Sequence, residues 1–383
     1  MGMGRGVVEA CAETGTAATG TTETSTAVAD PVETSPAVAD PVEKGPAKSG
    51  PAREVEAPRV GHNKPRRTGS WRRALLAALV IGAVVIPLSA AARPEIPAPA
   101  PAALAPLTPA TLAETYAANG ANAAEASRMA AADGDERRAA TDRAMADPAR
   151  HLLAYDGRGP GLATEILGDL AHADRIAVLV PGSDTSLDTY DRFRATALNL
   201  RHQLTHDAPN SRTAVVSWLG YDTPRTVSAT VLTASRADQA APHLREFVRQ
   251  LHAITGRTAR IALLCHSYGT VVCGRAAAGL DVSDLVLVGS PGTGTDSVAG
   301  LRTSARVWAA RGADDWVGDV PHVSADLFGT TVGFGTDPVS PEFGARVFAA
   351  GDGGHSDYFS PGSASLANLA RIVLGETTEV THA

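Results

Sequence analysis

The stretch that decides the fold is Arg260-Ile-Ala-Leu-Leu-Cys-His-Ser-Tyr-Gly-Thr-Val-Val-Cys-Gly274. Its apolar run stops at Cys265, and small residues follow Gly269, so we interpret it as a strand, a tight turn and a helix. Ser267 then lies at the apex of the turn, where a cramped backbone lifts a side-chain hydroxyl out of the sheet, as a nucleophilic serine requires. Gly269 lets the helix pass close to its strand, whereas Cys265 stands where Gly is usual. Taken alone this motif also fits an ordinary turn, so partners elsewhere must decide.

Composition sets broad limits on the protein's class. The chain has 383 residues and a net charge of -7, and its composition changes near residue 108, so only the remainder can bury a core. Arginines in the C-terminal two-thirds are scattered among acids, which argues against a nucleic-acid partner. The three cysteines, Cys11, Cys265 and Cys273, lack metal-ligand spacing. We expect no metal and no organic cofactor, and the sequence carries no signal of oligomeric state.

The N-terminal part predicts three successive segments. Residues 1–58 contain a low-complexity repeat with almost no large apolar side chain, so we expect a disordered tail. Residues 59–73 carry only positive charges. Residues 74–92 carry no charge and are mostly apolar, which is typical of a helix that enters the membrane.

Two interpretations of residues 74–92 stay open. The first is a transmembrane anchor that holds the protein in the cell membrane with the later residues outside. The second is a cleaved signal segment of a secreted protein, suggested by the small residues Ser89-Ala-Ala-Ala92. Since no Met lies between Met3 and Met129, the second would need a downstream start codon other than Met.

The remainder predicts an α/β domain. Residues 93–109 are a Pro/Ala linker, residues 110–150 favour one or two helices outside the main domain, and residues 377–383 are expected to be a tail. Between them, residues 151–376 alternate short β-branched runs with amphipathic ones, which predicts a mostly parallel sheet flanked by helices. We expect strands at 151–155, 175–180, 213–219, 260–265, 284–289, 305–311 and 345–349, and helices at 187–205, 239–255, 268–278 and 364–374.

Two further residues form a constellation with Ser267. Asp315 follows the strand 305–311, with Asp314 as the alternative acid, although acids also cap loops. His355 lies in a glycine-rich loop after the strand 345–349. Ligand sites in such sheets lie at the carboxyl ends of the strands. There His355 can accept the proton of Ser267 while Asp315 holds the other ring nitrogen.

An acyl-transfer site also needs donors for the developing oxyanion. The strand 175–180 runs into a Pro-Gly turn, and we expect the backbone N–H of Ser183 to be one donor. The other is the backbone N–H of Tyr268, at the start of the helix after the nucleophile. An ordinary strand-to-helix turn, with Ser183 as a helix cap, is the alternative.

From about Leu152 onward the chain resembles the α/β-hydrolase superfamily, and more narrowly an actinobacterial family classed as a domain of unknown function, DUF1023. The resemblance rests on five stretches: Val180-Pro-Gly182, Trp218-Leu-Gly-Tyr-Asp222, Leu264-Cys-His-Ser-Tyr-Gly269, Gly289-Ser-Pro-Gly292 and Gly354-His-Ser356. Two departures are Cys265 in place of the first Gly of the turn and Pro-Gly in place of the His-Gly of many relatives. The resemblance implies the α/β-hydrolase fold and serine hydrolase activity, but no firm substrate.

Four weaker expectations concern the surroundings of the turn. Tyr221 and Asp222 follow a strand and are candidates for lining the pocket, with a simple turn equally compatible. Residues 222–236 are a candidate lid. His266 is expected to pack. Cys265 and Cys273 flank the turn, so they either form a disulfide outside the cell or stay two buried thiols.

We therefore expect a serine hydrolase that cleaves a small-molecule or lipid-like acyl ester through Ser267, His355 and Asp315. Amide or peptide cleavage and acyl transfer use the same groups and stay open. A different class, a cell-surface binding protein that keeps the fold without turnover, is also open.

Overall fold

The computed structural model describes residues 96–320, 322, 324–327 and 330–383. The chain divides into two units, residues 1–76 and 77–383, and every described residue belongs to the second. The expected tail (1–58), basic segment (59–73) and membrane or signal segment (74–92) lie outside the described residues. Within the described part, no helix combines the length and the apolar character needed to cross a membrane.

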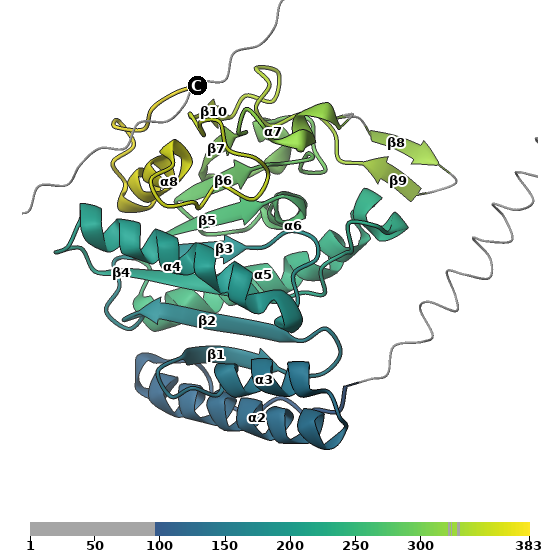
Figure 1. Cartoon of the computed structure of the whole chain (residues 1–383). Coiled ribbons are helices and arrows are strands. Elements are labelled where there is room, and N and C mark those ends of the chain that lie inside the picture. The colour runs from purple at the N-terminus through teal and green to yellow at the C-terminus, as the bar shows by residue number, and fades with distance from the viewer. Residues whose placement is uncertain (1–95, 321, 323, 328–329) are drawn as a thin grey trace, which may run out of the picture. The chain divides into compact units, whose positions relative to one another are not determined.

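An eight-stranded sheet forms the centre of the described domain (Figure 1). Its order is β1-β2-β4-β3-β5-β6-β7-β10. β2 runs antiparallel to both neighbours, whereas every other described pair in this sheet is parallel, so the prediction of a mostly parallel sheet is confirmed. The strands are β1 His151–Asp156, β2 Leu162–Gly168, β3 Arg175–Val180, β4 Thr213–Leu219, β5 Arg260–His266, β6 Asp284–Val288, β7 Arg306–Ala310 and β10 Arg346–Val347.

The middle of the sheet contains the point where the strand order reverses. β4 follows β3 on one side, and the chain then crosses to the other side to form β5. The register pairs Val180 with Cys265 and His266 with Val288, so β3, β5 and β6 end at the same edge. In sheets of this kind the carboxyl ends at the reversal point are the usual place for a ligand site.

Helices cover both faces of the sheet (Figure 1). α4 (Tyr190–Asp207) and α8 (Ala364–Leu374) share a core with Leu179 and Leu264. On the opposite face, α5 (Ser235–Thr255) and α6 (Tyr268–Ala276) share a core with Val178 and Leu263. Neighbouring strand residues point to opposite faces, and both faces are dry, which explains why these strands are apolar throughout.

The N-terminal helices of the domain lie beside β1 (Figure 1). They are α2 (Leu112–Ala132) and α3 (Glu136–Met145), preceded by the short helix η1 (Pro109–Thr111). Small residues of α2, Ala123 and Ala126, pack against Leu152 and Tyr155 of β1. Because alanine allows a close approach, a helix with a weak apolar face can still dock there. Asn122 of α2 donates from Nδ2 to the carbonyl of Ala100 at 2.7 Å. Since Ala100 lies upstream of η1, part of the expected linker contacts α2.

The structure differs from the expected elements in four places. β2 was not expected. The last strand contains only Arg346 and Val347, which pair with β7. Residues 377–383, expected to be a tail, pack on the domain, since Val380 is buried and Ala349 N donates to the Thr381 carbonyl at 2.8 Å. An unexpected hairpin, β8 (Ser324–Leu327) with β9 (Thr330–Gly333), follows β7. The remaining short helices are η2 (Leu187–Thr189), η3 (Ala229–Leu232), α7 (Val298–Leu301) and η4 (Trp316–Asp319).

Candidate active site

The turn between β5 and α6 holds Ser267 in a strained backbone conformation. Its φ of 54° and ψ of -129° are unusual for a residue with a side chain. A Cβ on Gly269 would lie 2.5 Å from the Val180 carbonyl oxygen and 2.6 Å from that of Pro181. The helix therefore passes so close to β3 that only glycine fits, which is the role that the sequence suggests for Gly269.

The structure brings Ser267, His355 and Asp315 into one row of hydrogen bonds. His355 Nε2 lies 2.9 Å from Ser267 Oγ, and His355 Nδ1 lies 2.9 Å and 3.1 Å from the two carboxylate oxygens of Asp315. A carboxylate can only accept, so Nδ1 carries the proton and donates it to Asp315. Nε2 is then free to accept from the Ser267 hydroxyl.

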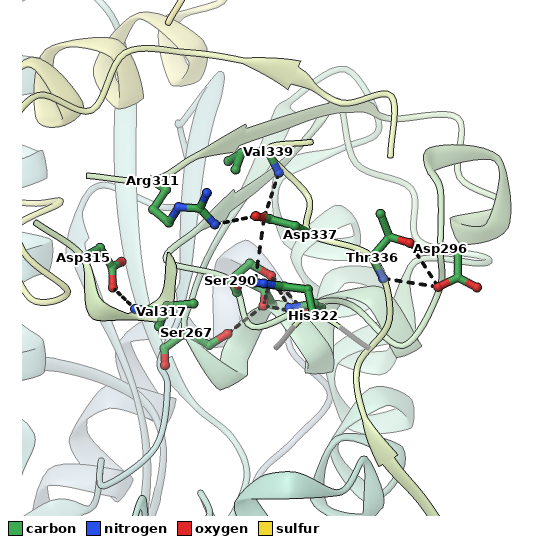
Figure 2. Close-up of polar contacts among 12 residues, drawn as sticks. Ser267, Ser290, Asp296, Arg311, Asp315, Val317, His322, Thr336, Asp337 and Val339 are labelled. Atoms are coloured by element: carbon green, nitrogen blue, oxygen red, sulfur yellow. Dashed lines mark hydrogen bonds and ion pairs between the residues drawn. The ribbon is translucent and has the colours of Figure 1, made fainter. Parts of the chain in front are cut away.

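Asp315 is buried, and three donors satisfy its carboxylate. Besides His355, the Tyr358 hydroxyl donates to Oδ2 at 2.5 Å. The Val317 N–H donates to Oδ1 at 2.9 Å (Figure 2). Burial raises the pKa of Asp315, but the hydrogen bonds from His355, Tyr358 and Val317 outweigh it and lower the pKa to about 2. Asp314 is exposed, and the histidine contacts Asp315 instead.

Tyr358 and Gly289 also lie beside the hydrogen-bonded residues Ser267, His355 and Asp315. The sequence alone predicts no contact with Asp315 for either of them. Burial raises the pKa of Tyr358, and its hydrogen bond to Asp315 raises it further, so the hydroxyl stays a donor. Gly289, after β6, has a φ of 57°. A Cβ there would lie 2.9 Å from Asp315 Oδ2 and 3.1 Å from His355 Cε1. Both residues matter because the fold places them next to Asp315, although they are distant from it in the sequence. Of the two, only Gly289 lies in a stretch that the sequence marks, Gly289-Ser-Pro-Gly292.

The turn after β3 lies directly beside the nucleophile. A Cβ on Gly182 would lie 2.6 Å from Ser267 Cβ and 3.1 Å from Ser267 Oγ. Ser183, the expected oxyanion donor, follows this glycine. Tyr268, the other expected donor, is the first residue of α6, where a backbone N–H has no acceptor within the helix. Tyr268 thus follows Ser267 in the chain, and Ser183 follows the glycine that lies against Ser267.

Tyr221 and Asp222, the candidate pocket residues, have other contacts. Tyr221 is buried beside Trp218, with ring centroids 6.0 Å apart, and its hydroxyl donates to the Pro181 carbonyl at 2.6 Å. It therefore supports the turn after β3 from within the core. Asp222 forms an ion pair with Arg236 at 2.9 Å, across the two ends of the candidate lid.

The candidate lid, residues 222–236, is fixed at both ends to the site. The Asp184 N–H donates to the Pro224 carbonyl at 3.0 Å. The Tyr268 hydroxyl donates to the Thr233 carbonyl at 2.7 Å. Thr233 also pairs with Val332 of β9, so the loop and the β8–β9 hairpin meet.

Polar contacts order the segments that follow β6, β7 and β9 (Figure 2). Arg311 pairs with Asp337 at 2.5 Å, and the Val339 N–H donates to the same carboxylate at 3.1 Å. His322 Nε2 donates to the Ser290 carbonyl at 3.2 Å. Figure 2 also shows Thr336 against Asp296. Each contact fixes a loop at the end of the sheet that carries Ser267.

Cys265 and Cys273 form a disulfide. Their Cα atoms lie 6.5 Å apart, within the range that a disulfide spans. Both cysteines are fully buried in the core between β5 and α6. The bond therefore links the strand before Ser267 to the helix after it.

As for metals, the part of the chain that the structure describes has no group of three or more His, Cys, Asp or Glu side chains that could hold an ion.

A strained serine between a central parallel strand and a helix, facing a histidine and an acid from later loops, is the arrangement of an α/β hydrolase. Residues 156–325 match the model of the family described as alpha/beta hydrolase. Together with the sheet described above, this match indicates that the described domain has the α/β-hydrolase fold.

Several known proteins are similar to parts of this chain. An uncharacterized protein of Mycobacterium tuberculosis is 33% identical over 262 residues, which cover 59% of this chain and 39% of that protein. An uncharacterized protein of Mycobacterium bovis is 34% identical over 170 residues, covering 41% and 63%. The chain thus matches less than two thirds of either relative. Among solved structures, esterase PE8 is 16% identical with a TM-score of 0.39, covering 56% of this chain and 98% of its own.

Proposed function

We propose that the domain is a serine hydrolase that cleaves an acyl ester through a covalent acyl-enzyme. The observation that carries the proposal is the continuous row from Ser267 Oγ through His355 to the buried Asp315. A strained serine whose hydroxyl faces a neutral imidazole nitrogen is poised to lose its proton as it attacks a carbonyl carbon. The substrate we favour is a small-molecule or lipid-like ester.

The reaction would proceed in two halves. Ser267 Oγ bonds to the carbonyl carbon while its proton passes to His355 Nε2, and collapse of the tetrahedral intermediate breaks the bond to the alcohol, which takes that proton. A water then attacks the acyl-enzyme, gives its proton to His355, and the Ser267–acyl bond breaks as Ser267 takes the proton back. Asp315 stays ionised and stabilises the imidazolium in both halves.

The oxyanion of each intermediate would be held by the backbone N–H groups of Ser183 and Tyr268. The positive end of α6 adds to the effect at Tyr268. The proposal can be tested at Ser183, because a backbone donor survives loss of the side chain. Ser183→Ala should keep the activity, whereas Ser183→Pro, which has no N–H, should lower kcat by about 10²- to 10³-fold. Equal activity in both variants would remove Ser183 from the site.

The hydrolase proposal is tested with a fluorophosphonate probe, which reacts covalently with activated serines. We expect the folded protein to be labelled, and Ser267→Ala to abolish both labelling and hydrolysis of p-nitrophenyl esters. Ser290→Ala is the matched control, since Ser290 is a buried serine at the end of the neighbouring strand. Folded protein without labelling would favour the non-catalytic binding protein instead. A labelled protein that releases acyl groups only from amides, or only to an added alcohol, would favour an amidase or acyltransferase.

We also propose that the domain works outside the cytoplasm, either tethered through residues 74–92 or secreted. The support is the Cys265–Cys273 disulfide, because such bonds persist mainly in oxidising compartments. Intact mass and N-terminal sequencing of protein from its native host test this. A mature start near Arg93 would exclude the anchor, and alkylated free thiols at both cysteines would contradict the placement outside.

A further inference from the structure

The imidazole of His355 lies against two aromatic rings that the proposed reaction does not use. The His266 ring centroid lies 4.7 Å from that of His355, and the Trp316 ring centroid lies 4.8 Å from it. The three residues come from separate segments: His266 is the last residue of β5, Trp316 is the first residue of η4, and His355 lies in a loop. A loop histidine gains a fixed ring orientation only if its surroundings restrict it.

His266 also holds the backbone of His355. Its Nε2–H donates to the His355 carbonyl at 2.7 Å, and its ring packs against Tyr358 with centroids 5.8 Å apart. Tyr358 in turn binds Asp315. His266 therefore contacts both the histidine of the row and the tyrosine that supports the acid.

The electrostatics fit this arrangement. Burial, together with the smaller effect of the neighbouring His355, lowers the pKa of His266 to about 4. At neutral pH His266 is therefore an uncharged donor that does not repel an imidazolium at His355. The Trp316 ring is tilted by 51° to the His355 ring, and at a centroid separation of 4.8 Å an indole can attract a nearby cation.

Trp316 differs from His266 in that it is partly open to solvent. Its side chain is 52% exposed, although large apolar side chains are usually covered. It follows Asp315 directly and begins η4. One part of the indole thus contacts His355, while the rest faces the solvent beside the row.

We propose that His266 and Trp316 are positioning residues that hold the His355 imidazole between Ser267 and Asp315. His266 fixes the loop backbone through its hydrogen bond, and the two rings restrict rotation of the imidazole. Neither residue touches the reacting atoms. The inference rests on the proposed function only for its effect on rate, because the orientation of His355 can be measured without turnover.

The measurement that needs no turnover is exchange of the His355 Nδ1 proton with water, followed by NMR on the full chain. In Trp316→Leu and in His266→Phe, which keeps a ring but loses the donor, exchange should become about tenfold faster. Trp316→Phe, which keeps a ring, should stay near the wild type. His252→Phe is the matched control, because His252 Nε2 also donates to a carbonyl, that of Asp281 at 2.7 Å, but lies far from His355.

With p-nitrophenyl butyrate as substrate, Trp316→Leu and His266→Phe should each lower kcat by about ten- to a hundredfold and keep KM within about a factor of two. The reason is that misplacing a catalytic group slows the chemical step. Unchanged proton exchange in both variants would overturn the inference, even if the melting temperature falls, since that result describes a purely structural role. Failure of the proposed function would look different: wild-type protein would resist the fluorophosphonate probe, and the exchange measurement would still decide this inference.

Discussion

Two glycines set the free space around the reacting groups. Gly182 leaves room beside Ser267 Oγ, and Gly289 leaves room for the contact between His355 and Asp315. At Gly289 the backbone also has a left-handed φ of 57°, so any other residue there is strained as well as crowded. A glycine beside an active site can thus matter through the volume that it leaves free.

Comparing Gly289→Ala with Gly279→Ala separates the effect of the space beside Asp315 and His355 from the effect of backbone strain. We expect a loss of about 1 kcal/mol in the free energy of unfolding from the positive φ. Because the new methyl would meet Asp315 and His355, kcat/KM should also fall by roughly 100-fold. Gly279→Ala is the control, since Gly279 has a φ of 90° but no heavy atom within 4 Å of its Cβ position. Similar activity in the two variants would show that the space at Gly289 is not needed.

The choice of acid is tested by two single substitutions. Asp315→Asn should lower kcat by about 10⁴-fold, because an amide no longer holds the Nδ1–H tautomer of His355. Asp314→Asn should stay within about twofold of the wild type, since its side chain is exposed. Steady-state kinetics with one ester suffice. The assignment fails if Asp314→Asn is the variant that loses turnover.

Local patterns explain which site residues the sequence could reveal. Ser267 lies in an abrupt change from apolar to small residues, and Asp315 and His355 each follow a strand-like run. Tyr358 has no such signal, because its contact with Asp315 forms only when two distant loops meet. The buried packing of Tyr221 has no such signal either, because the residue stands next to an acid at the end of a strand.

At the level of elements, β2 shows where sequence reasoning failed. Its run Leu162-Ala-Thr-Glu-Ile-Leu-Gly168 contains a glutamate, which argues against a buried strand. Glu165 is nevertheless fully buried, because Arg150 and Arg194 both donate to its carboxylate. These partners lie 15 and 29 residues away, so the compensation is invisible in the strand itself. The central strands had no such conflict, and their apolar runs predicted them.

The disulfide joins two elements, the strand β5 and the helix α6. Closing a loop of this length should stabilise the fold by about 2.5 kcal/mol through the unfolded state. We expect Cys265→Ala with Cys273→Ala to lose about that much in urea unfolding. Burial protects the bond, so dithiothreitol should reduce it only when the protein unfolds. Rapid reduction of the folded protein would contradict this expectation.

For the whole molecule, His266 and Asp315 make stability depend on pH. The pKa of His266 falls from 6.5 to about 4 on folding, so below pH 6.5 the unfolded chain takes up a proton that the folded chain does not. The contribution of His266 to the free energy of unfolding is complete above pH 6.5 and decreases as the pH falls to 4, by at most about 3 kcal/mol. The pKa of Asp315 falls from 3.8 to about 2, so its contribution is complete above pH 3.8 and is lost as the pH falls through 2.

Urea unfolding at pH 7.5 and pH 4.5 measures the His266 part. The wild type should lose more free energy of unfolding between these pH values than His266→Phe, by about 2 kcal/mol. His252→Phe serves again as the control for removing a histidine. Equal losses in all three proteins would mean that His266 is already protonated in the folded state at pH 4.5.

The position of the disulfide has a practical consequence for chemical analysis. Trypsin cuts after arginine and lysine, and none lies between Arg260 and Arg275, so residues 261–275 leave as one fragment. This fragment carries Ser267 together with both members of the Cys265–Cys273 bond. Its mass therefore records two things in the same molecule: the adduct on the serine, and the two hydrogen atoms that distinguish a thiol pair from a disulfide. A single spectrum of cell-derived protein can show whether the molecules that react are the ones that are oxidised.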